Sequence, residues 1–356
     1  MKNNTDKRIG IKDIAARAGV SIGTVDRVLH NRGEVKEATR KKVLEIVQEL
    51  DYTPNIFAKS LSSKRTTKLA IVIPDSSDNN PYWEKPVSGI KLAAEELTHY
   101  NTEILYEHFD ASDEEAFKNV LRKVCDQNPD GIVLNPVFKD ISLEFIQEFD
   151  KRAIPYVFID INLKNVNNLA YYGQDAEQSG LVAARLMEAS TPKVPNLLIV
   201  KQSKRKVFSS HIERRIEGFT RYYAERQKAI NAQTIEIDLN APNEPYQSLN
   251  KVFEMGNTYH GIFVPNSRGF KLAEYLKSRD LTNLVTIGYD LVDSNIDYMQ
   301  QGYLTYLISQ KPELQAYKAI WALFDHLVTK KPVRKTNYSA IDIIIKENIE
   351  YYLENK

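Results

Sequence analysis

Apolar residues near the N-terminus recur at the spacing of one helix face. Residues 11–18 place four apolar side chains on such a face, namely Ile11, Ile14, Ala15 and Ala18, which predicts an amphipathic helix. Gly19 ends this helix, because glycine readily adopts the left-handed conformation that follows a helix. Ser21 can cap a second helix over residues 22–29, since its hydroxyl can accept a free backbone N–H in the first turn.

Two further helices are predicted in the same region. The pattern indicates a third helix from about residue 36 to residue 50. Pro54 stops that helix, and Asn55 can cap a short fourth one over residues 56–61. Two short helices joined by a glycine-containing turn form a helix-turn-helix unit, which we therefore predict here.

From Lys68 onward, short and nearly continuous apolar runs alternate with helical patterns. The runs are Leu69–Ile73, Ile104–Tyr106, Gly131–Leu134, Tyr156–Ile159, Leu197–Val200, Gly261–Val264, Val285–Ile287 and Leu304–Ile308. The helical patterns include Val87–Leu97, Glu114–Val124, Ala176–Met187 and Phe270–Lys277. This alternation predicts an α/β fold with parallel sheets covered on both faces. Because about 290 residues exceed one comfortable core, we expect two doubly wound lobes.

The chain is therefore expected to have three parts. They are a helix-turn-helix domain (1–54), a hinge helix or linker (55–66) and a two-lobed α/β domain (67–356), which resembles the periplasmic sugar-binding-protein fold. Within the last part we expect an N-lobe of about 67–165 with 311–336, and a C-lobe of about 166–310 with 337–356.

Charge is distributed unevenly between these parts. Residues 1–65 contain 14 Lys/Arg and 8 Asp/Glu, a balance of +6, whereas residues 66–356 contain 34 and 39, a balance of −5. A basic head on an acidic body can direct one end of a molecule to a polyanion. A solvated basic helix pair would give the same balance, so charge alone does not decide between the two.

Composition narrows the class of protein further. The single cysteine, Cys125, excludes an internal disulfide framework and a Cys-based zinc site. No apolar run approaches the roughly 20 residues that cross a bilayer, and the first residues lack the apolar core of a signal peptide. We therefore expect a cytoplasmic protein without a membrane partner or a cofactor.

Two consecutive segments of the head carry a family resemblance. They are IKDIAARAGVSIGTVDRVLHNRG and TRKKVLEIVQELDYTPNIFAKSLSSK. Without gaps, they resemble the head and hinge of the lactose-repressor (LacI/GalR) family of transcription regulators. The resemblance includes the turn, both of its helices, the Tyr52-x-Pro54-Asn55 link and the hinge.

The resemblance implies a homodimeric repressor or activator on a pseudo-palindromic operator in double-stranded DNA. If residues 22–29 are the recognition helix, its N-terminal end faces base edges in the major groove. By resemblance, Leu61 of the hinge enters a central base step from the minor groove. The expected DNA-contacting residues are Ser21, Ile22, Gly23, Thr24, Arg27, Asn31, Asn55, Ala58, Lys59 and Leu61.

Polar residues follow the apolar runs of the larger domain. Ligands of open α/β sheets bind beyond the carboxyl ends of the strands, where Asp160, Asn266, Asp290 and Gln310 are expected. Arg215 follows another strand, and the first strand leads into a segment with Asn80, Tyr82 and Trp83. Such side chains hydrogen-bond sugar hydroxyls, while aromatic faces cover the ring. The positions also resemble those of ribose-type binding proteins, which implies a sugar effector.

Each of these residues also has a structural interpretation. Asp160 and Asn266 are compatible with strand–loop turns, Arg215 with an ion pair between lobes, and Gln310 with a hinge hydrogen bond. One aromatic side chain of some sugar binders is missing after the segment TIEID, where only Leu239, Asn240 and Pro242 stand. The effector could therefore be larger or flatter than a simple monosaccharide.

Three rival functions remain at this point. The same architecture could sense a nucleobase or nucleoside instead of a sugar. A transport-type binding protein is disfavoured by the basic head and by the lack of a signal-peptide pattern. An enzyme is disfavoured because the sequence lacks a Gly-x-Ser-x-Gly elbow, a Walker loop, a Gly-x-Gly-x-x-Gly motif and a His-Glu-x-x-His motif.

Overall fold

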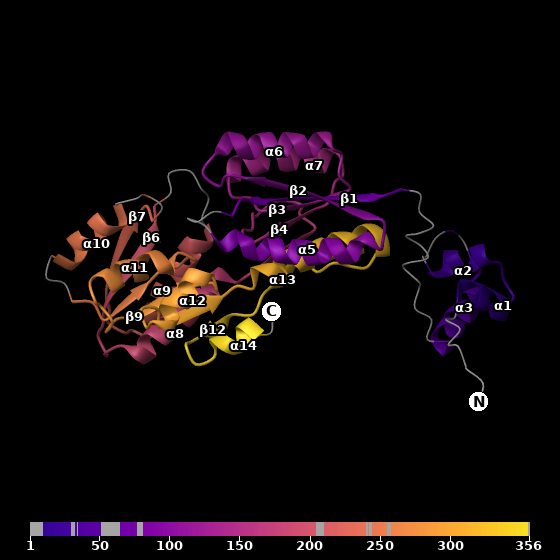
Figure 1. The fold of residues 1–356 in the computed structure, drawn as a ribbon. Coiled ribbons are helices and arrows are strands. Elements are labelled where there is room, and N and C mark those ends of the chain that lie inside the picture. Colours follow the sequence, from indigo (N-terminus) through magenta and orange to yellow (C-terminus); the bar gives the residue numbers. More distant parts are fainter. Residues whose placement is uncertain are drawn as a thin grey trace, which may run out of the picture. The chain divides into compact units, whose positions relative to one another are not determined.

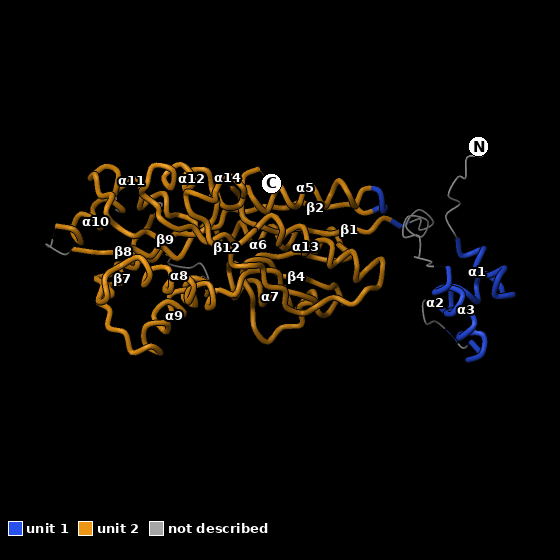
Figure 2. Tube along the Cα trace, turned by 90° about the horizontal axis from the view of Figure 1, so that it is seen from below, with its two compact units in different colours: residues 1–65, 99–101 blue, residues 66–98, 102–356 orange. Residues whose placement is uncertain are grey.

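The structure is a computed structural model in which two units can be distinguished. It describes residues 10–29, 33, 35–50, 65–76, 81–203, 210–239, 241, 244–254 and 258–354. One unit comprises residues 1–65 with 99–101, and the other comprises residues 66–98 with 102–356. Figure 2 colours the two units separately.

The first unit contains the three helices expected from the apolar pattern. They are α1 (Ile11–Ala18), α2 (Ile22–Leu29) and α3 (Glu37–Glu49). Gly19 has a φ of 66°, and the N–H of Val20 reaches the Ala15 carbonyl at 3.0 Å, which closes α1. The Ser21 hydroxyl oxygen accepts the Thr24 N–H at 3.1 Å, as predicted for a cap. The predicted fourth helix, residues 56–61, and the hinge up to residue 64 lie outside the described residues.

The N-lobe of the second unit is built on a six-stranded sheet in which all neighbours are parallel. Its order is β11-β5-β4-β3-β1-β2. The strands are β1 (Thr67–Pro74), β2 (Thr102–Phe109), β3 (Gly131–Leu134), β4 (Tyr156–Ile159), β5 (Ala170–Gly173) and β11 (Thr336–Tyr338). The helices are η1 (Pro81–Trp83), α5 (Glu84–Thr98), α6 (Glu114–Asp126), α7 (Lys139–Lys151) and α13 (Pro312–Phe324), which continues into the π-helical turn η2 (Asp325–Thr329). Helices α6 and α7 cover one face of the sheet, and α5 and α13 the other (Figure 1).

The C-lobe repeats this strand order. Its sheet has the order β12-β10-β9-β8-β6-β7, with only β12 antiparallel to its neighbour. The strands are β6 (Asn196–Gln202), β7 (Asn231–Ile237), β8 (Gly261–Phe263), β9 (Val285–Tyr289), β10 (Tyr306–Ser309) and β12 (Asp342–Ile344). The helices are α8 (Ala176–Ser190), α9 (Ser210–Glu225), α10 (Glu244–Glu254), α11 (Gly269–Ser278), α12 (Asp293–Gln300) and α14 (Ile349–Glu354). Side chains of α8 and α9 pack in one core cluster of the sheet, and those of α10 and α11 in another.

The strand order corrects the lobe boundaries that we expected. Strand β5 belongs to the first sheet, so the N-lobe continues beyond residue 165 to residue 173. Strand β11 extends the same sheet to residue 338, two residues past the expected limit. Strand β11 has only three residues, Thr-Asn-Tyr, and gives no apolar run. The short run of residues 170–172 in β5 is present in the sequence but was not assigned to a strand.

The chain crosses between the lobes three times, and one side chain links the three crossings. The crossings follow β5, β10 and β11. Gln174, in the first crossing, donates from Nε2 to the carbonyl of Ser309 at 2.9 Å and to that of Ala340 at 3.3 Å. These two acceptors lie in the second and third crossings, so Gln174 ties the hinge together.

None of the described helices is long and apolar enough to span a membrane.

Candidate ligand-binding site

A pocket between the two lobes collects the residues predicted to bind a ligand. It encloses about 560 Å³ that protein atoms do not fill, part of it open solvent. Seven of the eight predicted ligand residues line it: Tyr82, Trp83, Asp160, Arg215, Asn266, Asp290 and Gln310. The eighth, Asn80, lies outside the described residues. The structure thus brings the set together, and its binding role stays a prediction.

The two lobes contribute matching pairs of polar residues. Asn135 follows β3 and Asp160 follows β4, while Asn266 and Asp290 occupy the corresponding places after β8 and β9. Asp160 and Asp290 have φ values of 62° and 68°. Their N–H groups bond the carbonyls of Tyr172 and Ile308, each at 3.0 Å. A positive φ is uncommon outside glycine but accessible to aspartate, and here both aspartates adopt it at the pocket.

A buried chain of hydrogen bonds runs along the hinge side of the pocket. Gln310 donates from Nε2 to Asp290 Oδ2 at 2.7 Å and accepts from Arg215 Nη2 at 2.5 Å. Arg215 also donates to the Pro265 carbonyl at 2.9 Å, and its guanidinium lies 3.8 Å from the centre of the Tyr289 ring. Burial raises the pKa of Asp290 to about 7, although Arg215 and Gln310 act in the opposite direction. The carboxyl is therefore partly protonated at neutral pH.

The N-lobe wall is organised around the other aspartate. Asp160 accepts from the Tyr82 hydroxyl at 3.4 Å and from Asn135 Nδ2 at 3.3 Å. Burial raises the pKa of the Tyr82 hydroxyl well above its ordinary value, so this group stays a neutral donor. Trp83 packs edge-on against Tyr82 with ring centres 5.1 Å apart. Two aromatic rings thus stand beside a carboxylate, as expected for a site that covers a sugar ring.

Three buried amide or guanidinium atoms at the pocket find no hydrogen-bond partner within the described part of the chain. They are Arg215 Nε, Asn266 Nδ2 and Asn135 Oδ1. Burying such atoms without a partner costs free energy of about 1–3 kcal/mol each. A polar ligand would remove that cost if it supplied acceptors to Arg215 Nε and Asn266 Nδ2 and a donor to Asn135 Oδ1.

The sequence analysis missed several lining residues. Asn135 directly follows the apolar run Gly131–Leu134, so the rule applied to the other strands would have found it. His211 and Arg268 also line the pocket, but they stand within or next to helices α9 and α11, where the pattern gives no signal. Leu239 is buried in the C-lobe core and does not line the pocket, whereas Asn240 and Pro242 lie outside the described residues.

A close helix crossing holds Arg215 in place. A Cβ atom on Gly180 of α8 would lie 2.0 Å from the Arg215 carbonyl oxygen, and one on Gly218 of α9 would lie 2.0 Å from that of Glu177. Non-bonded atoms do not approach one another this closely, so only glycine permits this backbone contact. The crossing therefore sets how far Arg215 extends toward Gln310.

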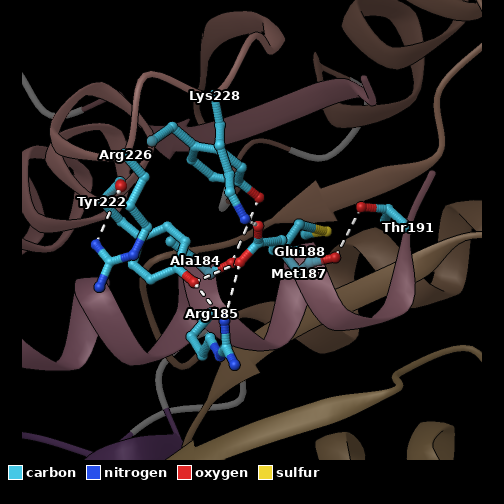
Figure 3. A network of polar contacts seen from close by, with 9 residues as sticks. Ala184, Arg185, Met187, Glu188, Thr191, Tyr222, Arg226 and Lys228 are labelled. Carbon is cyan, nitrogen blue, oxygen red and sulfur yellow. Dashed lines mark hydrogen bonds and ion pairs between the residues drawn. The ribbon is translucent and has the colours of Figure 1, made fainter. Parts of the chain in front are cut away.

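The other end of the same helix pair is fixed by a polar network (Figure 3). Glu188 of α8 accepts from the Tyr222 hydroxyl of α9 at 2.5 Å and pairs with Arg185 at 3.2 Å and with Lys228. The Arg226 guanidinium lies 4.0 Å from the centre of the Tyr222 ring. Helices α8 and α9 are thus joined at two places along their length, which restrains the position of Arg215.

In the first unit, the N-terminal end of α2 presents an exposed surface. Ser21, Ile22, Gly23 and Arg27 are exposed, while Thr24 is half-buried and bonds Ser21. Val25 and Val28, on the opposite face of α2, are buried in the core of the head. The remaining predicted DNA contacts, Asn31, Asn55, Ala58, Lys59 and Leu61, lie outside the described residues.

Comparison with known proteins agrees with both parts of the chain. The periplasmic binding protein domain matches residues 70–331, and the family described as bacterial regulatory proteins, lacI family, matches residues 10–55. The chain belongs to the LacI-type regulators. It is a DNA-binding regulator with a periplasmic-binding-protein sensor domain, which confirms the predicted fold class and family.

Three relatives of this LacI-type chain illustrate the match. Catabolite control protein A of Streptococcus mutans is 42% identical over 43% of this chain and 44% of its own length, so the alignment spans less than half of that relative. Catabolite control protein A of Priestia megaterium is 25% identical over 98% of this chain and 99% of its own. A Bacteroides fragilis structure described as a LacI transcriptional regulator has a TM-score of 0.73 at 28% identity, and covers 81% of this chain and all of its own.

One ion pair connects the two lobes of the regulator at the start of helices α5 and α12. Lys85 Nζ lies 3.3 Å from Asp293 Oδ1, and the Asp293 side chain is 84% exposed. Because water screens such a pair, it contributes at most about 1 kcal/mol. We expect Lys85→Gln to weaken ligand affinity less than about fivefold in isothermal titration, and the charge swap Lys85→Asp with Asp293→Lys to restore it. A tenfold loss would mean that the pair has a larger role.

Proposed function

We propose that the chain is a sequence-specific transcription regulator whose operator affinity is controlled by a small carbohydrate-like effector bound between the lobes. The observation that carries the proposal is the set of buried donors and acceptors without partners, on Arg215, Asn266 and Asn135, that line one pocket. Exposed residues of α2 would read the operator, and residues 55–66 would transmit the effector signal.

The chemistry of the pocket favours a polyol over an apolar ligand. Carboxylates of both lobes can accept from hydroxyl groups, while Arg215 and Asn266 can donate to hydroxyl oxygens. Tyr82 and Trp83 add buried aromatic surface. A sugar has donors, acceptors and an apolar ring face in one small molecule, so it satisfies all three kinds of group.

We further propose that the regulator binds DNA as a homodimer. A single head reads few base pairs and rarely supplies specific affinity alone. By resemblance to the lactose-repressor family we place the dimer contact on helix α5, which carries Leu92, a residue that is 51% exposed. Two heads on one two-fold axis would require an operator with two inverted half-sites.

The DNA-binding part of the proposal is tested with Arg27→Ala in the full chain. Arg27 is exposed on α2, and loss of one base or phosphate contact costs about 1–3 kcal/mol, or roughly 5- to 150-fold in affinity. We expect this loss of affinity for an operator selected from a random DNA pool, and fluorescence anisotropy measures it. The same titration should give a stoichiometry of two chains per operator.

The matched control is Arg122→Ala, an exposed arginine of α6 in the N-lobe. It should leave operator affinity unchanged, and ligand binding should survive in both variants. Selected sugars should shift the operator affinity of the unmodified chain, with purines screened in parallel. Binding without sequence preference, or a response to purines alone, would contradict the proposal.

A further inference from the structure

The two walls of the ligand pocket carry different charge. The described lining residues of the N-lobe include one ionisable acid, Asp160, and no cationic side chain. The C-lobe wall matches the N-lobe wall in its asparagine and aspartate, Asn266 and Asp290, but adds three basic side chains. These are His211, Arg215 and Arg268.

Asp290 is the only acid among the described lining residues of the C-lobe wall. Both oxygens of Asp290 accept from Gln310, from its backbone N–H at 3.3 Å and from Nε2 at 2.7 Å. Burial raises the pKa of Asp290 to about 7, so its charge is only partial at neutral pH. Asp160 belongs to the opposite wall, where Tyr82 and Asn135 donate to it.

Arg268 is a nearly buried cation at the edge of this wall. Its residue is 6% exposed, and it stands immediately before α11, whose N-terminal end favours negative charge. Its backbone N–H donates to Asn266 Oδ1 at 2.8 Å, which fixes Arg268 relative to Asn266. Burial lowers the pKa of Arg268 to about 10, although the Asp238 carboxylate acts in the opposite direction. The guanidinium therefore stays charged at neutral pH in a poorly solvated place.

Two amide or guanidinium donors on this wall await a partner. Within the described residues, Arg215 Nε and Asn266 Nδ2 have no acceptor, and both residues are at least 95% buried. An open amide acceptor, Asn135 Oδ1, belongs to the N-lobe wall. A ligand that satisfies these atoms presents a donor to Asn135 and acceptors to Arg215 and Asn266, and a negatively charged acceptor forms the stronger hydrogen bond with the arginine.

We infer that the effector is a sugar derivative with a carboxylate or phosphate group, and that Arg268 binds this anionic group. The inference rests on the proposed function and specifies the ligand class of the same pocket. Arg215 and Asn266 would complete the donor set around the anion. The hydroxyls at the other end of the sugar would meet Asp160 and Asn135.

The test compares sugars that differ in charge but share a carbon skeleton. Isothermal titration of the full chain would use glucose, glucuronate and glucose 6-phosphate, followed by the galactose and mannose series. In the series that binds, the anionic member should bind at least about tenfold tighter than the neutral one, because charge-assisted hydrogen bonds are the stronger kind. The uronate and phosphate arms identify which anion the pocket takes.

Variants of Arg268 locate the effect. Arg268→Gln should lower the affinity for the anionic sugar at least about tenfold and the affinity for the neutral sugar less than twofold. Arg268→Lys should keep the preference for the anionic sugar. The control Arg279→Gln removes an exposed arginine at the other end of α11 and should change neither affinity.

Two outcomes would overturn the inference. One is equal or tighter binding of the neutral sugar by the unmodified chain, which decides the matter even if Arg268→Gln does not fold. The other is an equal loss for both sugars in Arg268→Gln. If a neutral sugar binds and shifts operator affinity, the proposed function stands and only the inference fails. If neither neutral nor anionic sugars bind, the proposed function itself fails.

Discussion

Asp290→Ala should abolish measurable effector binding while operator binding without effector persists. Asp290 is 1% exposed, and both of its oxygens hold Gln310, which in turn holds Arg215. Removing the carboxylate deletes a charged ligand contact worth about 1.5–3 kcal/mol. It also releases the two side chains that shape the C-lobe wall. The combined loss in affinity is expected to exceed roughly 100-fold.

Isothermal titration with the effector found by screening measures this loss, and anisotropy measures operator affinity. The control Asp297→Ala removes an exposed carboxylate from nearby helix α12 and should bind effector normally. Asp290→Asn separates charge from shape, because it keeps the size of the side chain. Unchanged affinity in Asp290→Ala would remove this residue from the binding site.

The same variants test the protonation state of Asp290. Its pKa is raised to about 7 by burial, whereas in the unfolded chain it is near 4. A carboxyl with a raised pKa stabilises the fold most below pH 4, and this contribution is lost as pH rises toward 7. The unfolding free energy of the unmodified chain, relative to Asp290→Asn, should therefore fall by about 1 kcal/mol per pH unit between pH 5 and pH 7. Urea denaturation without ligand measures the difference, and a constant difference would contradict the raised pKa.

Strands with a continuous apolar run were predictable from the sequence. Gly131–Leu134 and Tyr156–Ile159 are buried on both faces and have the predicted bounds. The edge strand β7 is different, because most of its residues are exposed and its sequence, NAQTIEI, is largely polar. A strand at a sheet edge has only one neighbouring strand, and only part of one of its faces is buried. Its apolar run is therefore short, and the pattern does not show where the strand begins and ends.

The pocket-lining residues were predictable where they follow a strand. Asp160, Asn266 and Asp290 come after apolar runs, and a parallel sheet places all such ends at one edge. Arg268 reaches the pocket from the start of a helix. The spacing of apolar residues along the sequence does not indicate which residues face the start of a helix. The charge difference between the two walls therefore emerged only from the structure.

Gly180→Ala should weaken both the fold of the C-lobe and the binding of effector. The added methyl group would lie 2.0 Å from the Arg215 carbonyl oxygen and 2.8 Å from its carbonyl carbon. Because both contacts are with backbone, the clash is relieved only if α8 and α9 move apart. Overpacking of this kind costs about 1–3 kcal/mol of unfolding free energy. The shift also moves Arg215 away from Gln310, which it contacts at 2.5 Å.

Two measurements on Gly180→Ala separate the loss of stability from the displacement of Arg215. Met187→Ala, on the same helix, creates a cavity at a fully buried side chain away from the pocket, and should cost about 2–5 kcal/mol. Both variants should therefore unfold at lower urea concentration than the unmodified chain. Only Gly180→Ala should also lose at least about tenfold in effector affinity, measured where both variants are folded, because only it shifts the buried arginine. Equal affinity in the two variants would show that the glycine crossing serves packing alone and does not position Arg215.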